Sequence, residues 1–358
     1  MQPFNVEIFD REFNLIQHYN VGAIDYNYDY LSTVENSVLI EYNENVQKGD
    51  YIRIVNNTDS YFGFISSIAV NEAIQGYSEL RFKPFIALFD APILFDTTLQ
   101  GSATSLEQAI ADIITNYWIS NSDTDENIYG LEVETISTTS GWGFHITSDQ
   151  KGLNKSIINF MSSIIRRSLT KYQVGLYAEP DFVNKKITVS IGVKSVGTLY
   201  IEADLPNVIE KSIVVNETTE DMNKLVIYDQ ADLVTNVIYY KHPDGTYDTT
   251  DDDRIVPVIY GITSVAVAEG ESFASIAQDA ADKQFDTDTY SNLIELTVQN
   301  EDELVMPSTL TIGQTVNVIS NGTSYSSILT GVERSTKTKL IFGTIRLDLT
   351  KIIKGGLM

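Results

Sequence analysis

The sequence predicts a mainly β protein with an α+β insert, and three observations support this fold class. Most segments are rich in β-branched and aromatic residues and are separated by Gly, Asn, Asp and Ser, which is typical of strands joined by turns. Only three segments show the apolar spacing of helices. The chain has 358 residues, 43% of them hydrophobic, which is enough for two or three domains.

The expected strands combine alternating side chains with short apolar runs. They occupy 4–10, 23–31, 37–42, 51–55, 61–70, 80–89, 171–179, 186–193, 224–229, 236–241, 254–260, 292–298, 314–320, 325–332 and 339–350. The expected helices occupy 104–118, 154–169 and 272–285. In the first of them, Ser105 and Gln108 have the spacing of a capping box.

These elements divide the chain into three blocks. Residues 1–100 are almost entirely strand and turn, residues 101–205 mix two helices with strands, and residues 206–358 return to strands with one inserted helix. No Pro-rich or Ser-rich linker separates the blocks, so we expect the chain to cross between domains. We find no sequence repeat, but two diverged copies of one barrel would fit the strand-rich blocks.

The composition excludes several classes of protein. With 24 basic and 49 acidic residues the net charge is −25, which argues against an open nucleic-acid-binding face, although an acidic pore would let DNA slide without binding. No apolar run is long enough to span a bilayer, and the N-terminus does not have the pattern of a signal peptide. The absence of cysteine excludes disulfides and Cys-ligated zinc, and we expect synthesis in a cytoplasm.

An acidic stretch, His242–Arg254, lies between two expected strands. Its five aspartates are Asp244, Asp248, Asp251, Asp252 and Asp253. An EF-hand loop that opened at Asp248 would need Gly at its sixth position, where Asp253 stands. The Pro-Asp-Gly turn and the returning strand favour a solvated hairpin tip, and residues 251–253 are the alternative, a place for an adventitious cation.

No motif of an enzyme is present. The three histidines, His18, His145 and His242, lack zinc-binding spacing, and neither a nucleophile elbow nor a phosphate-binding glycine loop occurs. We therefore predict no enzymatic activity, no metal and no cofactor, while a glycosidase that uses two carboxylates stays open because the sequence selects no pair. Trp142 is a candidate sugar platform, and packing in a core is its alternative interpretation.

Tyr26, Tyr28 and Tyr30 lie on one face of a single expected strand, because strands repeat every two residues. Such a face suits a wall of a barrel core, a subunit interface or a sugar-binding surface.

The order of the elements resembles the tail hub proteins of tailed bacteriophages, which include the baseplate hub and the N-terminal structural part of tail-associated lysins. FNVEIFDREFNLIQHY, GDYIRI and YFGFISSI are similar to the beginning of these proteins. VIYYKHPDGTYD, IVPVIYG, ASIAQDAADKQF, NLIELTV, IGQTVNV and IFGTIRLDLTKIIKGG are similar to their C-terminal barrel. The resemblance covers nearly the whole chain.

The resemblance implies two tail-tube-like β-barrels, in blocks 1–100 and 206–358, and a mixed α/β domain in block 101–205. It implies a homotrimeric ring at the distal end of the tail in the virion, which adapts the symmetry of the tail tube, closes the channel and later lets DNA pass. The implied partners are the distal tail protein or tail tube, the tape-measure protein and other tail tip or receptor-binding proteins. A receptor- or carbohydrate-binding tail protein is the alternative, and a carboxylate-dependent glycosidase is the third possibility.

Overall fold

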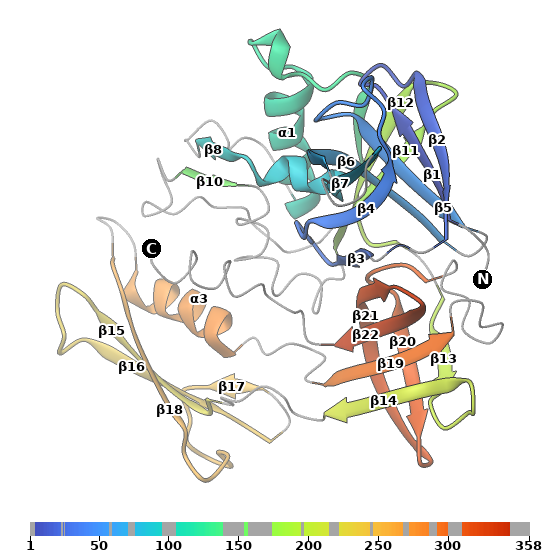
Figure 1. Ribbon diagram of the computed structural model, residues 1–358. Coiled ribbons are helices and arrows are strands. Elements are labelled where there is room, and N and C mark those ends of the chain that lie inside the picture. The colour runs from blue at the N-terminus through green and yellow to red at the C-terminus, as the bar shows by residue number, and fades with distance from the viewer. Residues whose placement is uncertain are drawn as a thin grey trace. The chain divides into compact units, whose positions relative to one another are not determined.

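The computed structural model divides the chain into two compact units (Figure 1). Unit 1 comprises Met1–Val214 and Leu293–Met358, and unit 2 comprises Val215–Asn292. The described residues are 4–22, 24, 26–56, 59–70, 76–94, 105–138, 154–156, 174–194, 197–214, 222–243, 246–267, 272–285, 292–299 and 310–343. Strands dominate them and helices are few, which confirms the predicted fold class. The three-block division at residues 100 and 205 stays a prediction.

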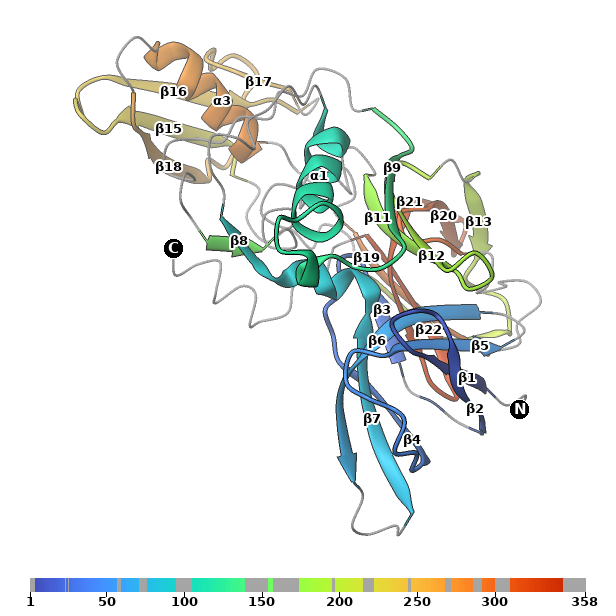
Figure 2. The same cartoon turned by 90° about the horizontal axis from the view of Figure 1, so that it is seen from above.

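The first sheet of unit 1 has six antiparallel strands in the order β2-β1-β5-β6-β7-β4. Its strands are β1 (Phe4–Phe9), β2 (Leu15–Val21), β4 (Asn36–Glu41), β5 (Tyr51–Asn56), β6 (Asp59–Val70) and β7 (Tyr77–Pro84). The two long strands β6 and β7 reach beyond the rest of the sheet together with β4 (Figure 2). The expected strand 80–89 ends at Pro84, and Phe85–Asp90 form a 3-10 helix instead. Proline has no backbone N–H for the strand ladder, so it marks this boundary.

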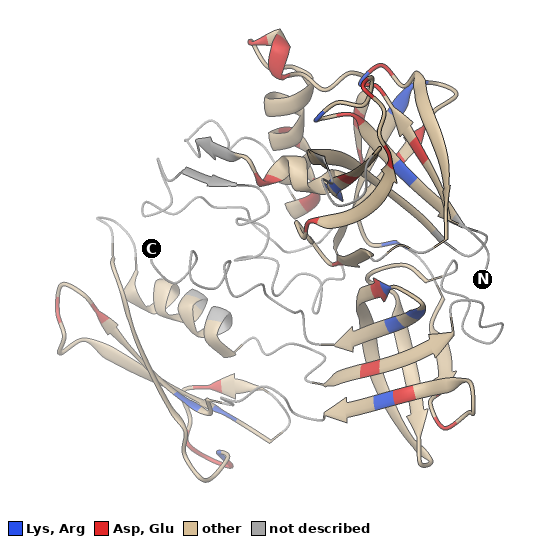
Figure 3. Ribbon diagram, viewed as in Figure 1, with Lys and Arg blue, Asp and Glu red and all other residues tan. Residues whose placement is uncertain are grey.

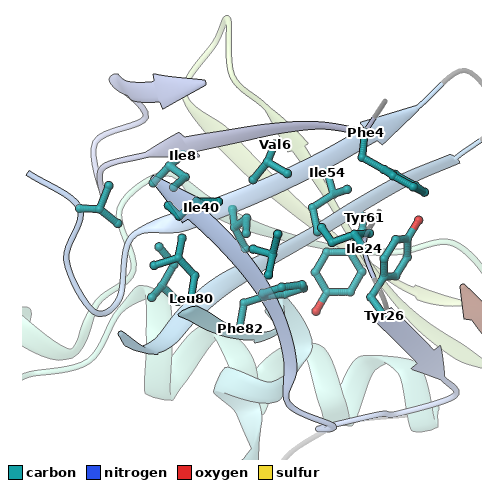
Figure 4. Packing of buried hydrophobic residues seen from close by; sticks show 14 residues of the cluster. Phe4, Val6, Ile8, Ile24, Tyr26, Ile40, Ile54, Tyr61, Leu80 and Phe82 are labelled. Atoms are coloured by element: carbon teal, nitrogen blue, oxygen red, sulfur yellow. The ribbon is translucent and has the colours of Figure 1, made fainter. Parts of the chain in front are cut away.

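One face of this sheet forms the first core. Side chains alternate between buried and exposed along β4, and nearly so along β1 and β7, as period-two geometry requires. The buried set gathers on the inner side of the curled sheet (Figure 4) and comprises Phe4, Val6, Ile8, Ile24, Tyr26, Val38, Ile40, Val46, Ile52, Ile54, Tyr61, Ile65, Leu80 and Phe82. Burial of these aliphatic and aromatic groups is the main force that holds the sheet together.

The second sheet of unit 1 contains strands from both ends of the chain. Its order is β13-β20-β21-β22-β19-β14, and β3 pairs with β21 beside this path. Its strands are β3 (Tyr26–Asp29), β13 (Leu199–Glu202), β14 (Val208–Val214), β19 (Leu293–Gln299), β20 (Thr315–Ser320), β21 (Thr323–Arg334) and β22 (Lys337–Gly343). Since β14 and β19 pair with each other, unit 2 is an insertion between two neighbouring strands of this sheet.

Strand β3 connects the two sheets of unit 1. It pairs antiparallel with the C-terminal end of β21, and Asp29 lies opposite Gly331. A β-carbon at Gly331 would lie 2.2 Å from Asp29 Oδ1, so a larger residue there would force the Asp29 carboxylate to move. The strand expected over 23–31 is thus shorter in the structure, where it spans Tyr26–Asp29. Its pairing with β21 makes it part of the second sheet.

A small mixed layer completes unit 1. Strands β11 (Gly175–Asp181), β12 (Lys186–Gly192) and β9 (Leu131–Thr135) form a three-stranded sheet in that order, beside helix α1 (Leu106–Ile114). Ser105 Oγ accepts a hydrogen bond from Gln108 N at 3.2 Å, which confirms the predicted cap of α1. The Gln108 side chain does not complete the box, because its amide donates to Asp112 Oδ1.

The expected helix over 154–169 lies largely outside the described residues. Its first residues, Asn154–Ser156, form strand β10, which pairs antiparallel with β8 (Pro92–Leu94). Two further helical segments follow α1: a π-helical turn over Thr115–Ile119, which continues the helix expected to residue 118, and a 3-10 turn over Thr124–Glu126, which the sequence did not predict.

Unit 2 is a four-stranded sheet with one helix. Its strands lie in the order β17-β16-β15-β18, with β15 (Lys224–Asp229), β16 (Asn236–Lys241), β17 (Tyr247–Asp248) and β18 (Tyr260–Val265). Helix α3 (Phe273–Phe285) is the predicted third helix, and it packs on one face of the sheet through a core of Leu225, Ile227, Tyr239, Ala277, Ala281 and Phe285.

The strand expected over 254–260 is wrong, because the strand begins only at Tyr260. The preceding segment is held by Asn223, whose Nδ2 donates to Pro257 O at 2.8 Å and whose Oδ1 accepts from Ile259 N at 2.8 Å. Strand β18 then runs parallel to β15 instead of returning beside β16. Together with backbone bonds from Ile255 N to Lys241 O and from Asn223 N to Ile259 O, these side-chain bonds hold the segment before Tyr260 without a regular strand ladder.

Candidate functional site

The tyrosines of β3 lie inside unit 1. Tyr26 is 1% exposed in the first core and its ring lies 6.3 Å from that of Tyr28, which contacts the cores of both large sheets. Tyr30 is buried just after the strand, and its hydroxyl donates to Val174 O at 2.7 Å. Tyr26 and Tyr28 thus pack in the cores of the two large sheets and Tyr30 bonds to the mixed layer, and a role of the three tyrosines in a subunit interface stays a prediction.

A short hairpin forms within the acidic stretch, between β16 and the two-residue strand β17, whereas the expected hairpin had residues 254–260 as its returning strand. Lys241 pairs with Tyr247, Tyr240 pairs with Asp248, and His242 N donates to Thr246 O at 2.8 Å. Asp244 and Gly245 of the turn lie outside the described residues. Asp251, Asp252 and Asp253 follow the hairpin and are exposed to solvent.

Two of the described carboxylates of this stretch, Asp248 and Asp251, have partners within it. Asp248 Oδ1 accepts from Thr250 N at 2.6 Å and lies 3.2 Å from His242 Nε2. Hydrogen bonds from Thr250, first from its side chain and then from its backbone, lower the pKa of the Asp248 carboxyl, and His242 adds to this effect. Asp251 forms an ion pair with Arg254 at 3.7 Å.

The alternative of a cation at residues 251–253 receives no support from the described part of the chain. Within it, no group of three or more His, Cys, Asp and Glu side chains is placed to hold a metal ion. Trp142 lies outside the described residues, so its role as a sugar platform stays a prediction. Among the described helices, none is long and apolar enough to cross a membrane.

The face of the unit 2 sheet opposite α3 carries tyrosine and aliphatic side chains, of which Tyr260 and Ile262 are exposed and Val226 is buried. Register places Tyr240, Lys224 and Tyr260 in one row across three strands, and Ile238, Val226 and Ile262 in the next. Tyr260 and Ile262 are 64% and 71% exposed. The Lys224 ammonium lies 5.4 Å and 4.9 Å from the ring centres of Tyr240 and Tyr260. Sheet faces with exposed aromatic and aliphatic side chains are typical of surfaces that bind other proteins.

A polar hollow lies where the two edge strands of the first sheet approach each other. It has a volume of about 430 Å³ and is lined by Gln17, Tyr19, Glu41, Tyr42, Asn43, Glu44 and Asn45. No pattern in the sequence indicates this hollow, because residues 17–19 and 41–45 come together only when the six-stranded sheet curls. Acidic residues occur in strands and loops of both units (Figure 3).

Comparison with known proteins gives no match in sequence. No protein-family model and no curated protein matches the chain.

Solved structures do match the fold. The tail protein from Neisseria meningitidis MC58 superimposes with a TM-score of 0.56 at 13% identity, over 95% of this chain and 96% of that one. The 43 kDa tail protein of prophage MuSo2 from Shewanella oneidensis superimposes with a TM-score of 0.57 at 13% identity, over 96% of this chain and 98% of that one. The resemblance to phage tail proteins is thus confirmed at the level of the fold: this chain has the fold of these tail proteins along nearly its whole length.

Proposed function

We propose that the chain is a structural component of the tail tip or baseplate of a phage or prophage, and that it acts as the hub of that assembly. The observation that carries this proposal is the extent of the fold match. Two tail proteins superimpose on at least 95% of the chain, so the match takes in both large sheets, the mixed layer and the inserted unit 2. A match to a single common sheet would support no such role.

As a hub, the chain forms a homotrimeric ring that contacts the distal tail protein or tail tube, the tape-measure protein and other tail tip or receptor-binding proteins. The ring closes the channel before infection and lets DNA pass afterwards. The net charge of −25 supports this role, because like charges keep DNA from binding to the wall of a channel. The exposed face of the unit 2 sheet supports assembly with other proteins, since apolar surface gains free energy when it is covered.

The test has two parts. Sedimentation of the purified chain over a wide concentration range, followed by electron microscopy of the heaviest species, should give a threefold ring. Gold-labelled antibody against the chain should bind tailed particles from its source at the end of the tail distal to the capsid.

The two experiments test different claims: labelling tests a structural role in the tail, and the symmetry of the ring tests the trimeric hub. Absence of label from tailed particles would contradict a structural role in the tail. Label at the distal end, together with a ring of another symmetry, would contradict the trimeric hub alone. Enzymatic activity is not part of the proposal, and the carbohydrate-binding role of Trp142 and the glycosidase stay predictions from the sequence.

A further inference from the structure

The polar hollow of the first sheet lies between the two edge strands of the sheet. Strands β2 and β4 are the two edges of the six-stranded sheet, and no backbone ladder joins them. Side chains bridge them instead: Tyr19 Oη donates to Glu41 O at 3.1 Å, and Asn43 Nδ2 donates to Gln17 Oε1 at 3.3 Å. The curled sheet therefore stays open along this line, and the hollow occupies the opening.

Three side chains of the hollow, those of Gln17, Tyr19 and Asn43, are held before any ligand arrives. The Asn43 side chain is fixed at both ends, because Nδ2 donates to Gln17 and Oδ1 accepts from Asn45 N at 2.9 Å. Tyr19 is half-buried, and burial raises the pKa of its phenol, which keeps the hydroxyl protonated and able to donate. Tyr42, by contrast, leaves 54% of its surface exposed beside these polar groups. Preorganised polar groups lower the entropic cost of binding.

The lining restricts the kind of ligand. It contains two carboxylates, Glu41 and Glu44, and no basic side chain, so phosphates and other anions are repelled. Apolar ligands are disfavoured because the only apolar surfaces among the lining side chains are the tyrosine rings and short methylene stems. The remaining groups are amides, carboxylates and phenols, which together offer both donors and acceptors.

We propose that this hollow is a binding site for a neutral saccharide. The exposed ring of Tyr42 provides a flat apolar surface for the C–H face of a sugar ring, as aromatic side chains with one wet edge do. The amides of Asn43 and Asn45 and the carboxylates of Glu41 and Glu44 hydrogen-bond to the hydroxyls of the sugar, each of which both donates and accepts. A hollow of about 430 Å³ has the size of a small-molecule site. The proposal does not depend on the hub role.

The test is saturation-transfer NMR on the full-length chain. The probes are glucose, galactose and N-acetylglucosamine as neutral sugars, with spermidine as a cationic probe that would suit the two carboxylates. We expect at least one neutral sugar to bind with a dissociation constant on the order of 1 mM, since a site open to solvent covers only part of its ligand.

Three variants locate the site. Tyr42→Ala should weaken binding at least tenfold, whereas Tyr42→Phe keeps the ring and should stay within about threefold of the original chain. Tyr200→Ala is the matched control, because Tyr200 is 69% exposed on β13 and outside the hollow. It should leave binding unchanged.

The outcomes that would overturn the proposal are distinct. Absence of transfer from all three sugars at about 10 mM would exclude the expected affinity. Sugar binding that survives Tyr42→Ala would place the site elsewhere. Binding of spermidine alone, lost in Tyr42→Ala, would assign the hollow to a cationic ligand instead.

Discussion

Phe182 at the tip of the β11–β12 hairpin fastens the mixed layer of unit 1 to the first sheet. Its ring stacks on Phe9 with a centroid distance of 4.0 Å and meets Phe13 and Phe62 edge-on at 6.0 Å each. The guanidinium of Arg53 lies 5.4 Å from the ring centre. The perturbation we choose is Phe182→Ala, which removes all of these contacts at once.

The expected decrease in the free energy of unfolding of Phe182→Ala follows from the burial of the ring and from its contacts with other rings. Full burial of a phenylalanine contributes roughly 1.5–3 kcal/mol, and Phe182 is half-buried, so about 1 kcal/mol of transfer free energy is lost. The stacked pair with Phe9 adds about 1 kcal/mol. The total loss in the free energy of unfolding is therefore about 2 kcal/mol, which corresponds to a decrease of roughly 3–4 °C in the Tm of a domain of the size of unit 1.

The next residue provides the matched control. Val183 lies in the same turn and is 90% exposed, so Val183→Ala should change the free energy of unfolding by no more than about 0.5 kcal/mol. The turn itself is fixed by Asp181, whose Oδ1 accepts from the backbone N–H groups of Val183 and Asn184. Neither substitution touches these bonds.

The assay is urea unfolding followed by tryptophan fluorescence, with hydrogen exchange of the β11–β12 amides as a local measurement. In Phe182→Ala these amides should exchange faster, since the hairpin loses its anchor. Equal stability of the two variants, or a loss below about 0.5 kcal/mol in Phe182→Ala, would refute the view that this ring joins the two layers.

Three further predictions concern buried groups of unit 1. Tyr30→Phe should cost about 1–3 kcal/mol, because it leaves the buried carbonyl of Val174 without the Tyr30 hydroxyl; urea unfolding measures the loss. Gly331→Ala should lower the Tm, because its β-carbon would lie 2.2 Å from Asp29 Oδ1; calorimetry shows the shift. Burial raises the pKa of Tyr51 to about 12, so the stability that its neutral phenol contributes is complete below pH 10 and is lost as the pH rises towards 12. The free energy of unfolding, measured against pH, should therefore decrease less steeply over this range in Tyr51→Phe than in the original chain.

Each of these predictions has an outcome that contradicts it. A Tyr30→Phe chain as stable as the original would mean that another group satisfies the carbonyl of Val174. Gly197→Ala is the control for Gly331→Ala, because a β-carbon at Gly197 meets nothing within 4 Å, and equal shifts in the two variants would remove the steric explanation. Identical alkaline profiles with and without the Tyr51 phenol would show that its titration is not linked to unfolding.

Local elements could be predicted because their signals lie within a few neighbouring residues. Period-two alternation predicted β1 and β4, and the apolar stripe together with Ser105 predicted α1 and its cap. Helix α3 was predicted in the same way, within residues 272–285. The absence of local markers also explains one mistake, since nothing near residues 254–259 shows that Asn223 will bind their backbone.

The β-rich class, the acidic balance and helices α1 and α3 could be predicted from the sequence, because they depend on composition and on spacings of two to four residues. Only the tertiary structure decided which strands pair. It placed the tyrosines of β3 against β21, with Asp29 opposite Gly331, and it brought Gln17 beside Asn43 to form the polar hollow. Pairings between distant segments depend on the closure of long loops and on how whole sheet faces pack. Neither can be predicted from a short stretch of sequence.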